Sequence, residues 1–168
     1  MVVFLGYSDS GKTSAMEALI KALVKEAKKV GTLKHIPEKA FTIDKRGKDT
    51  WRHAAAGAST VAALAPNELT VVKRGDTSGT SIDDLLRIFA HDGIDYVFVE
   101  GFYRKFSGRR GVTRILCAKS REDVTELLKS HPKPACIVGK FVDDEKYLRG
   151  VPLFRLPRDL TMVLNLIR

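Results

Sequence analysis

The chain has 168 residues, a length typical of one compact domain with a single sheet and its covering helices. Its 29 Lys and Arg outnumber 20 Asp and Glu, which gives a formal charge of +9, and its 44% hydrophobic content is ordinary for a globular protein. These values argue against a repeat array and a disordered chain. The surplus charge predicts an anionic partner: nucleic acid, a phosphorylated small molecule, a lipid surface or an acidic protein.

Two features of the sequence indicate the compartment. The two cysteines, Cys117 and Cys136, each lie in an apolar run, which favours two core residues over a disulfide. The first residues lack the basic segment of a signal sequence, and no apolar stretch reaches 18 residues. We therefore expect a cytoplasmic protein without membrane contact.

Short apolar runs alternate with segments of helical periodicity along the whole chain. Strands are predicted at 2–5, 30–34, 59–64, 69–72, 96–99, 112–117, 135–138 and 153–156. Helices are predicted at 12–27, 49–57, 120–130, from 158 onward, and from a capping box at Thr80 and Asp83 to Gly93. Strands separated by helices indicate parallel pairing, so we expect an α/β protein: a three-layer sandwich with a mainly parallel sheet flanked by helices.

A phosphate-binding sequence follows the first predicted strand. Residues 6–13, Gly-Tyr-Ser-Asp-Ser-Gly-Lys-Thr, match the P-loop pattern G-x-x-x-x-G-K-[ST] in full. The two glycines permit a tight turn, the lysine would bridge β- and γ-phosphates, and the threonine hydroxyl suits Mg²⁺. We predict one nucleotide-binding domain of the P-loop NTPase fold over 1–168, with its nucleotide held by Gly6, Ser8, Asp9, Ser10, Gly11, Lys12, Thr13 and Ser14.

A P-loop also needs a carboxylate for the metal ion. Glu100 is the best candidate, because it ends an apolar run typical of a buried strand and precedes a glycine where the chain bends. A solvated acid at a strand end is the alternative. The predicted metal ligands are Thr13, Glu100 and Asp44.

The segment 34–53 is dense in charge. We expect it to leave the sheet at the carboxyl ends of the strands, which is the edge where the P-loop lies. A connection this long favours a switch or substrate-contacting loop over solvated coil. With Lys12, the acidic residues Asp44 and Asp49 are candidate catalytic groups, which would position water or a metal ion. Four further residues are candidates for contacting a second substrate or a partner: Lys34, His35, Lys48 and Arg52.

A second basic segment, 104–114, comes directly after Glu100 and Gly101. We expect it at the edge of the sheet where the P-loop lies, called here the nucleotide edge. There Arg104 and Lys105 would meet a second substrate or an acidic partner. A solvated loop is the alternative. The lysines of the first helix need no ligand, because cations near a helix C-terminus are expected from the helix dipole.

Several blocks resemble the molybdopterin-guanine dinucleotide biosynthesis protein B (MobB) family in order and spacing, over roughly residues 2–103: residues 6–13, 32–35, 41–44, 47–52, 55–58 and 99–102. The resemblance implies a GTP-binding, weakly GTP-hydrolysing protein that uses Mg²⁺ and is often a homodimer. Such a protein assists the molybdenum cofactor guanylyltransferase MobA in attaching GMP to molybdopterin, so a molybdopterin compound is a possible ligand. The sequence departs at Tyr103, where the family usually has lysine, which leaves Arg104 and Lys105 as the nearest cations.

Two other functions compete with this interpretation. A P-loop small-molecule kinase would need an arginine-rich lid and an acceptor-activating acid, for which 104–110 and Asp49 are available. A nucleic-acid-binding module ranks last, because the sequence contains no RNP motif, zinc finger or helix-turn-helix signature.

Overall fold

The computed structural model describes residues 1–106, 108–142 and 145–168, with the side chains of Tyr103 and Arg104 outside that description. Its elements, in chain order, are β1 (Val2–Leu5), α1 (Lys12–Lys25), β2 (Val30–Lys34), α2 (Asp49–Ala55), β3 (Thr60–Ala65), β4 (Glu68–Lys73), α3 (Ile82–Arg87), β5 (Tyr96–Glu100), α4 (Tyr103–Phe106), β6 (Thr113–Cys117), α5 (Arg121–Ser130), β7 (Cys136–Val138), β8 (Tyr147–Leu148), β9 (Val151–Phe154) and α6 (Leu160–Ile167). None of the described helices is long and apolar enough to cross a membrane.

The chain divides into two compact units. Unit 1 comprises Met1–His35 and Leu86–Arg168, and unit 2 comprises Ile36–Leu85. That the two units act together as one nucleotide-binding domain, as the sequence suggests, stays a prediction.

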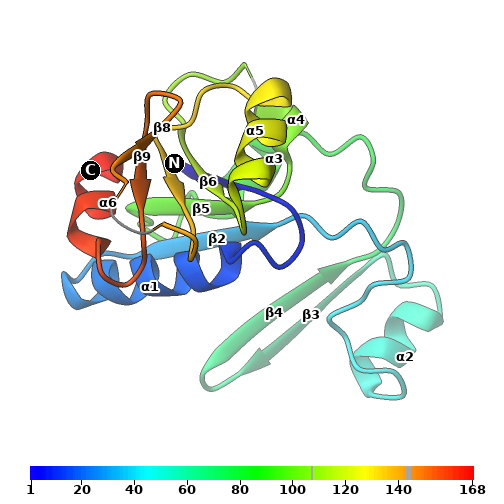
Figure 1. Ribbon diagram of the computed structural model, residues 1–168. Helices are drawn as coiled ribbons and strands as arrows, with labels where there is room; N and C mark the ends of the chain where they lie inside the picture. The colour runs from blue at the N-terminus through cyan, green and yellow to red at the C-terminus, as the bar shows by residue number, and fades with distance from the viewer. Residues whose placement is uncertain (107, 143–144) are drawn as a thin grey trace. The chain divides into compact units, whose positions relative to one another are not determined.

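Unit 1 is built on a sheet of seven strands in the described part of the chain, in the order β2-β5-β1-β6-β7-β9-β8 (Figure 1). Each neighbouring pair is parallel except β8 and β9, which form an antiparallel hairpin at one side. The parallel strands therefore all end at the same edge of the sheet, where the chain leaves for the helices. The predicted α/β class with a mainly parallel, helix-flanked sheet is confirmed.

Apolar side chains fill both faces of this sheet. On one face, Phe4 and Phe98 are fully buried with their ring centroids 5.2 Å apart, and they belong to a core that includes residues of α1 and α6. Helices α4 and α5 lie on the opposite face (Figure 1), and each contributes buried side chains such as Phe106 and Val124. Two covered faces explain why the central strands are continuous apolar runs.

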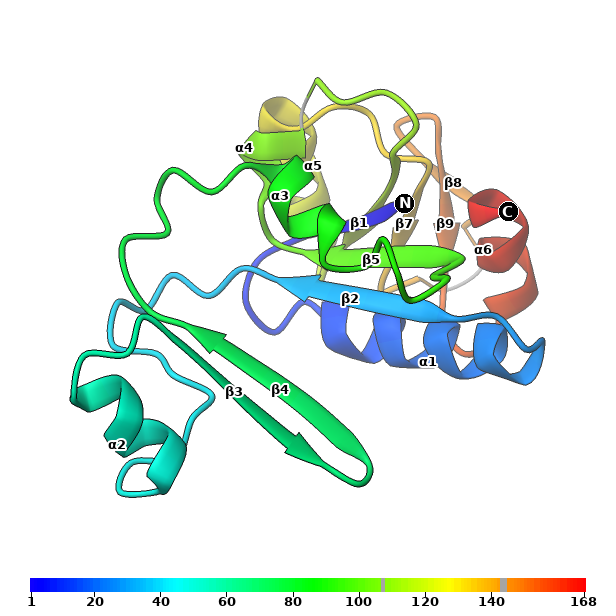
Figure 2. The same cartoon turned by 180° about the vertical axis from the view of Figure 1, so that it is seen from behind.

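Unit 2 consists of a long connection, helix α2 and an antiparallel hairpin of β3 and β4 (Figure 2). The hairpin pairs Thr60 with Lys73 at its open end and Ala65 with Glu68 at its turn. Both strands were predicted to within two residues at each end, because Pro66 and Asn67 mark the turn between them.

The helix predicted from Thr80 to Gly93 differs in its start and its length, since it ends at Arg87. Ile82 is its first residue, so the N-cap is Ser81, whose hydroxyl accepts a hydrogen bond from the Asp84 N–H (3.1 Å) and donates to the Asp84 carboxylate (2.6 Å). The capping box is therefore displaced by one residue from the predicted one. The short elements α4 and β8 were not predicted, because two to four residues carry too little periodicity.

Cys117 and Cys136 are free, fully buried and part of the core cluster, as predicted. Burial raises the pKa of each thiol to about 12, since a thiolate would lose its hydration there. We expect neither cysteine to react with a thiol reagent at pH 8 while the protein is folded, and both to react in 6 M guanidinium. Counting labelled thiols with a chromogenic disulfide checks this, and rapid labelling in the native state would contradict it.

Candidate functional site

The P-loop forms the turn between β1 and α1, and its glycines are required by its geometry. Gly6 has φ of +144°, and a Cβ at this position would lie 2.2 Å from the carbonyl oxygen of Cys117 on β6. Gly11 caps α1 in the left-handed region with φ of +87°. Because other residues adopt neither conformation readily, the loop needs glycine at both ends.

The N-terminus of α1 is open to an anion. Its N-cap residue is Gly11, which has no side chain to cap the helix, and its first turn contains no acidic residue. By contrast, the Ser120 side chain at the start of α5 accepts a hydrogen bond from the Asp123 N–H, and two acids occupy its first turn. The first N–H groups of α1 and the positive end of its dipole are thus suited to phosphate oxygens, and the sequence Gly11-Lys12-Thr13-Ser14 supplies them.

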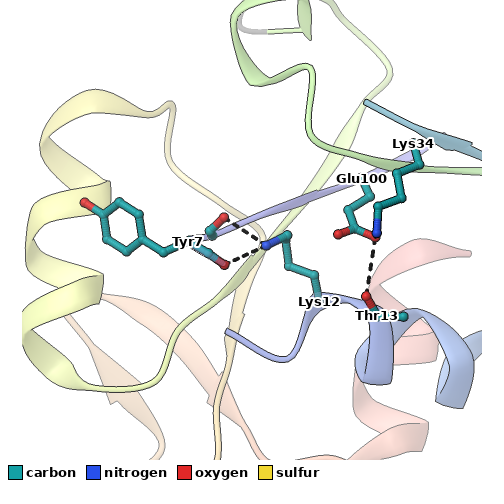
Figure 3. Close-up of polar contacts among 6 residues, drawn as sticks. Tyr7, Lys12, Thr13, Lys34 and Glu100 are labelled. Atoms are coloured by element: carbon teal, nitrogen blue, oxygen red, sulfur yellow. Dashed lines mark hydrogen bonds and ion pairs between the residues drawn. The ribbon is translucent and has the colours of Figure 1, made fainter. Parts of the chain in front are cut away.

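Lys12 lies across the loop and stabilises it. Its Nζ donates to the carbonyl oxygens of Gly6 (3.1 Å) and Tyr7 (2.6 Å), while the Tyr7 ring points away from the ammonium group (Figure 3). These contacts use two of the three Nζ donors among the described residues, and the third remains for a phosphate oxygen.

Glu100 is the meeting point of three elements (Figure 3). It ends β5, and its Oε2 accepts a hydrogen bond from the Thr13 hydroxyl at 3.5 Å. The same Oε2 lies 3.4 Å from Nζ of Lys34, the last residue of β2. The structure therefore brings together Thr13 and Glu100, two of the predicted metal ligands, and adds Lys34, which was predicted to contact a second substrate or a partner.

His35 braces the end of β5 next to this carboxylate. Its backbone N–H donates to the Glu100 carbonyl oxygen (2.9 Å), and its ring packs against that of Phe102 with ring centroids 4.8 Å apart. Gly101 has φ of +83°, and a Cβ there would lie 2.9 Å from Cβ of His35. The glycine after Glu100 therefore allows the histidine to pack closely.

The remaining loop residues differ in exposure. Ser8, Asp9 and Ser14 are exposed, and Asp9 has a left-handed φ of +57°. Ser10 is buried, and its Oγ has no hydrogen-bond partner among the described residues. Its side chain therefore lies beneath the loop, so only its backbone is placed to meet a nucleotide.

Asp44 belongs to a polar network within unit 2. Its carboxylate is largely buried and accepts hydrogen bonds from the Thr50 hydroxyl (2.8 Å) and from Nη2 of Arg74 (3.1 Å). These contacts join the long connection to α2 and to the end of the hairpin. Sequence reasoning missed Thr50 and Arg74, because nothing local indicates a partner 30 residues away.

The other candidates from this segment are exposed. Asp49 begins α2 and lies 3.6 Å from Arg52 in a solvent-facing pair, and Lys48 is the N-cap residue of the same helix. The roles predicted for Asp44, Asp49, Lys48 and Arg52 in binding or catalysis stay predictions.

The expectation that the whole basic segment lies at the nucleotide edge is wrong for Arg109 and Arg110. They precede β6, whose first residue pairs with Val2 at the start of β1, so they lie at the opposite edge of the sheet. Arg114 donates there to the carbonyl oxygens of Phe106 (2.6 Å) and Arg109 (3.2 Å). Lys105 lies on α4 and is exposed, whereas the side chain of Arg104 falls outside the described residues.

Other cations occupy the nucleotide edge, and sequence reasoning did not select them. Lys119, Lys140 and Arg155 are exposed residues that follow the ends of β6, β7 and β9 within two positions. For Lys119 and Lys140 the available signal was the first basic residue after each predicted strand, whereas Arg155 lay inside the strand predicted at 153–156. Parallel pairing places those residues on one side of the P-loop.

Within the ranges that the structure describes, no three or more His, Cys, Asp or Glu side chains are grouped closely enough to hold a metal ion. A Mg²⁺ ion at Thr13 and Glu100 would thus take its other ligands from phosphate oxygens and water. This pattern is usual for Mg²⁺ beside a nucleotide.

The chain is similar to known proteins over most of its length. The family model "MobB: Molybdopterin guanine dinucleotide synthesis protein B" matches residues 1–130. A putative molybdopterin-guanine dinucleotide biosynthesis adapter protein of Methanocaldococcus jannaschii is 32% identical over 127 residues, which are 76% of this chain and 50% of that protein. The corresponding adapter protein of Haemophilus influenzae is 39% identical over 97 residues, 58% of this chain and 53% of that protein. The chain spans about half the length of the curated relatives it matches.

Solved structures share the fold along the whole chain. The crystal structure of Bacillus subtilis MobB superposes with a TM-score of 0.77 at 22% identity and covers 99% of this chain and 97% of its own. A MobB homologue from Bacillus stearothermophilus gives a TM-score of 0.71 at 25% identity with the same coverage.

The Asp44 network predicts a stability difference between two acidic residues. We expect Asp44→Asn to destabilise the protein by about 1–3 kcal/mol, because it leaves the partly buried Arg74 guanidinium without its carboxylate. Asp49→Asn, at an exposed pair, should change stability by less than about 0.5 kcal/mol. Urea unfolding of both variants measures the difference, and equal stabilities would refute the structural role of Asp44.

Proposed function

The chain belongs to the family of molybdopterin guanine dinucleotide synthesis protein B (MobB), and we propose that it acts as a nucleotide-binding adapter in making the guanine dinucleotide form of the molybdenum cofactor. The observation that carries this proposal is the family match over residues 1–130, which includes the P-loop, Glu100 and all of unit 2. The named adapter relatives support the same role.

GTP is the proposed nucleotide. The glycine-shaped loop, the uncapped start of α1 and the Lys12 ammonium favour a polyphosphate, whatever its base. The choice of guanine rests on the family, whose product carries that base. Lys12 would contact the β- and γ-phosphates, and the N–H groups of the loop would hold the remaining oxygens.

The donor set fits Mg²⁺, since the Thr13 hydroxyl and the Glu100 carboxylate lie 3.5 Å apart at the end of the loop. When bound, Mg²⁺ would neutralise charge between the β- and γ-phosphates. Any hydrolysis is proposed to be slow. Asp49, exposed on α2, and Asp44 are the proposed carboxylates for orienting water.

The molybdenum cofactor guanylyltransferase (MobA) is the proposed partner, with a molybdopterin compound as a possible second ligand. Cations at or just after the ends of the parallel strands, among them Lys34, Lys119 and Lys140, would favour such an anionic ligand. A homodimer and a cytoplasmic location are proposed from the family resemblance and from the composition.

Lys12→Ala should weaken binding of a fluorescent GTP analogue with MgCl₂ by about tenfold to a hundredfold, because it removes the charge that meets the phosphates. Lys21→Ala, at an exposed position of α1, is the matched control and should bind as the wild type does. Titration by fluorescence anisotropy measures both, with an ATP analogue in parallel. Undiminished binding by Lys12→Ala would refute the P-loop assignment.

The adapter role predicts nucleotide-dependent capture of the partner. We expect the immobilised chain to retain the purified guanylyltransferase from the same organism, more strongly with GTP and Mg²⁺ than with GDP. Lys12→Ala should lose that nucleotide dependence. If nothing is retained in any nucleotide state, the adapter proposal fails, whereas phosphorylation of an added small acceptor would favour a kinase.

A further inference from the structure

Lys34 and Glu100 are opposite residues on paired strands. Parallel pairing of β2 with β5 sets Lys34 directly across from Glu100, and their side chains meet at 3.4 Å. Figure 3 shows the Lys34 ammonium and the Thr13 hydroxyl approaching the same carboxylate oxygen. A cation thus already lies where the carboxylate and the P-loop threonine converge.

Among the described residues, Lys34 is the cation paired with Glu100. The Lys12 ammonium is bound to two carbonyl oxygens of the P-loop instead. The two lysines therefore have different roles. Lys12 stabilises the conformation of the P-loop, and Lys34 neutralises the Glu100 carboxylate.

The two partners differ in exposure. The Glu100 side chain is 14% exposed and the Lys34 side chain 56%. A carboxylate largely removed from water needs a compensating charge. A lysine side chain that is more than half exposed forms a weak ion pair, because water solvates the ammonium group almost as well as the carboxylate does. Another cation can therefore displace it readily.

We propose that Lys34 is a resident counter-ion of Glu100. Its ammonium group neutralises the carboxylate while no divalent cation is bound, and a divalent cation displaces it on binding. The proposal rests on the proposed nucleotide function of the same site. Without Lys34, a free carboxylate at the end of the P-loop would repel an incoming polyphosphate. Lys34 is thus a positioning residue that makes nucleotide binding less dependent on Mg²⁺.

The test compares the affinity for a fluorescent GTP analogue in excess EDTA with that in saturating MgCl₂. For Lys34→Met, we expect the EDTA affinity to fall about tenfold and the Mg²⁺ affinity by less than about threefold, so the ratio of the two rises. Lys34→Arg should restore the wild-type ratio. Lys21→Met, an exposed lysine of the same unit, should leave it unchanged. With Glu100→Gln already present, adding Lys34→Met should no longer change the ratio.

An equal loss in both conditions would make Lys34 a simple phosphate ligand and overturn the proposal, as would no loss in either. A second measurement needs no nucleotide: Mn²⁺ alone is titrated against the protein and followed by electron paramagnetic resonance. Lys34→Met should bind Mn²⁺ several-fold more tightly than the wild type, because the ion no longer displaces an ammonium group. Equal Mn²⁺ affinities would overturn the proposal. If wild type and Lys12→Ala both fail to bind nucleotide, the proposed function fails, and the Mn²⁺ titration still decides the role of Lys34.

Discussion

The pairing of β2, β5 and β1 in parallel register is the constraint on which the rest of the site depends. Lys34 lies opposite Glu100, and Phe4 of β1 also pairs with Glu100 just before the P-loop begins. Side chains alternate between the two faces of a strand. A shift of β5 by one residue relative to β1 and β2 would therefore turn Glu100 away from both Thr13 and Lys34. The packed core resists that shift, since it would move Phe98 away from Phe4, against which its ring packs, to the opposite face of the sheet. The chemistry at the sheet edge is therefore held in register by the core beneath it.

Charge is distributed unevenly between the two units. Unit 2 contains seven basic and seven acidic residues, whereas unit 1 contains 22 basic and 13 acidic ones, so the whole surplus of +9 belongs to the unit with the P-loop. The positive charge thus accompanies the phosphate-binding elements. Exposed apolar side chains occur in both units, among them Ile43 and Leu64 in unit 2 and Ile88 and Met162 in unit 1. The two units therefore differ in net charge and not in whether apolar side chains are exposed.

Local patterns were sufficient to predict much of this protein. The bounds of β1 and β2 were predicted correctly; β1 is an apolar run that ends at Gly6, and the P-loop motif identified the connection that follows it. The start of the helix at Ile82 was predicted one residue too early because Thr80 and Ser81 are both suitable N-caps, and its end was predicted too late. Such choices depend on which hydroxyl the first turn meets, which spacing alone does not reveal.

Long-range arrangement was harder to predict. The pair of Asp44 and Arg74 joins residues 30 positions apart, with no periodic signal between them. Arg109 and Arg110 were assigned to the wrong edge because they follow Glu100 in sequence but enter β6, and a segment that enters a parallel strand lies at its starting end. Gly6 is a related case, because its fit against the Cys117 carbonyl depends on a strand more than 100 residues away. The P-loop is thus fitted against the backbone of β6: a larger residue at position 6 would collide with the Cys117 carbonyl oxygen, a group that every residue at position 117 would present.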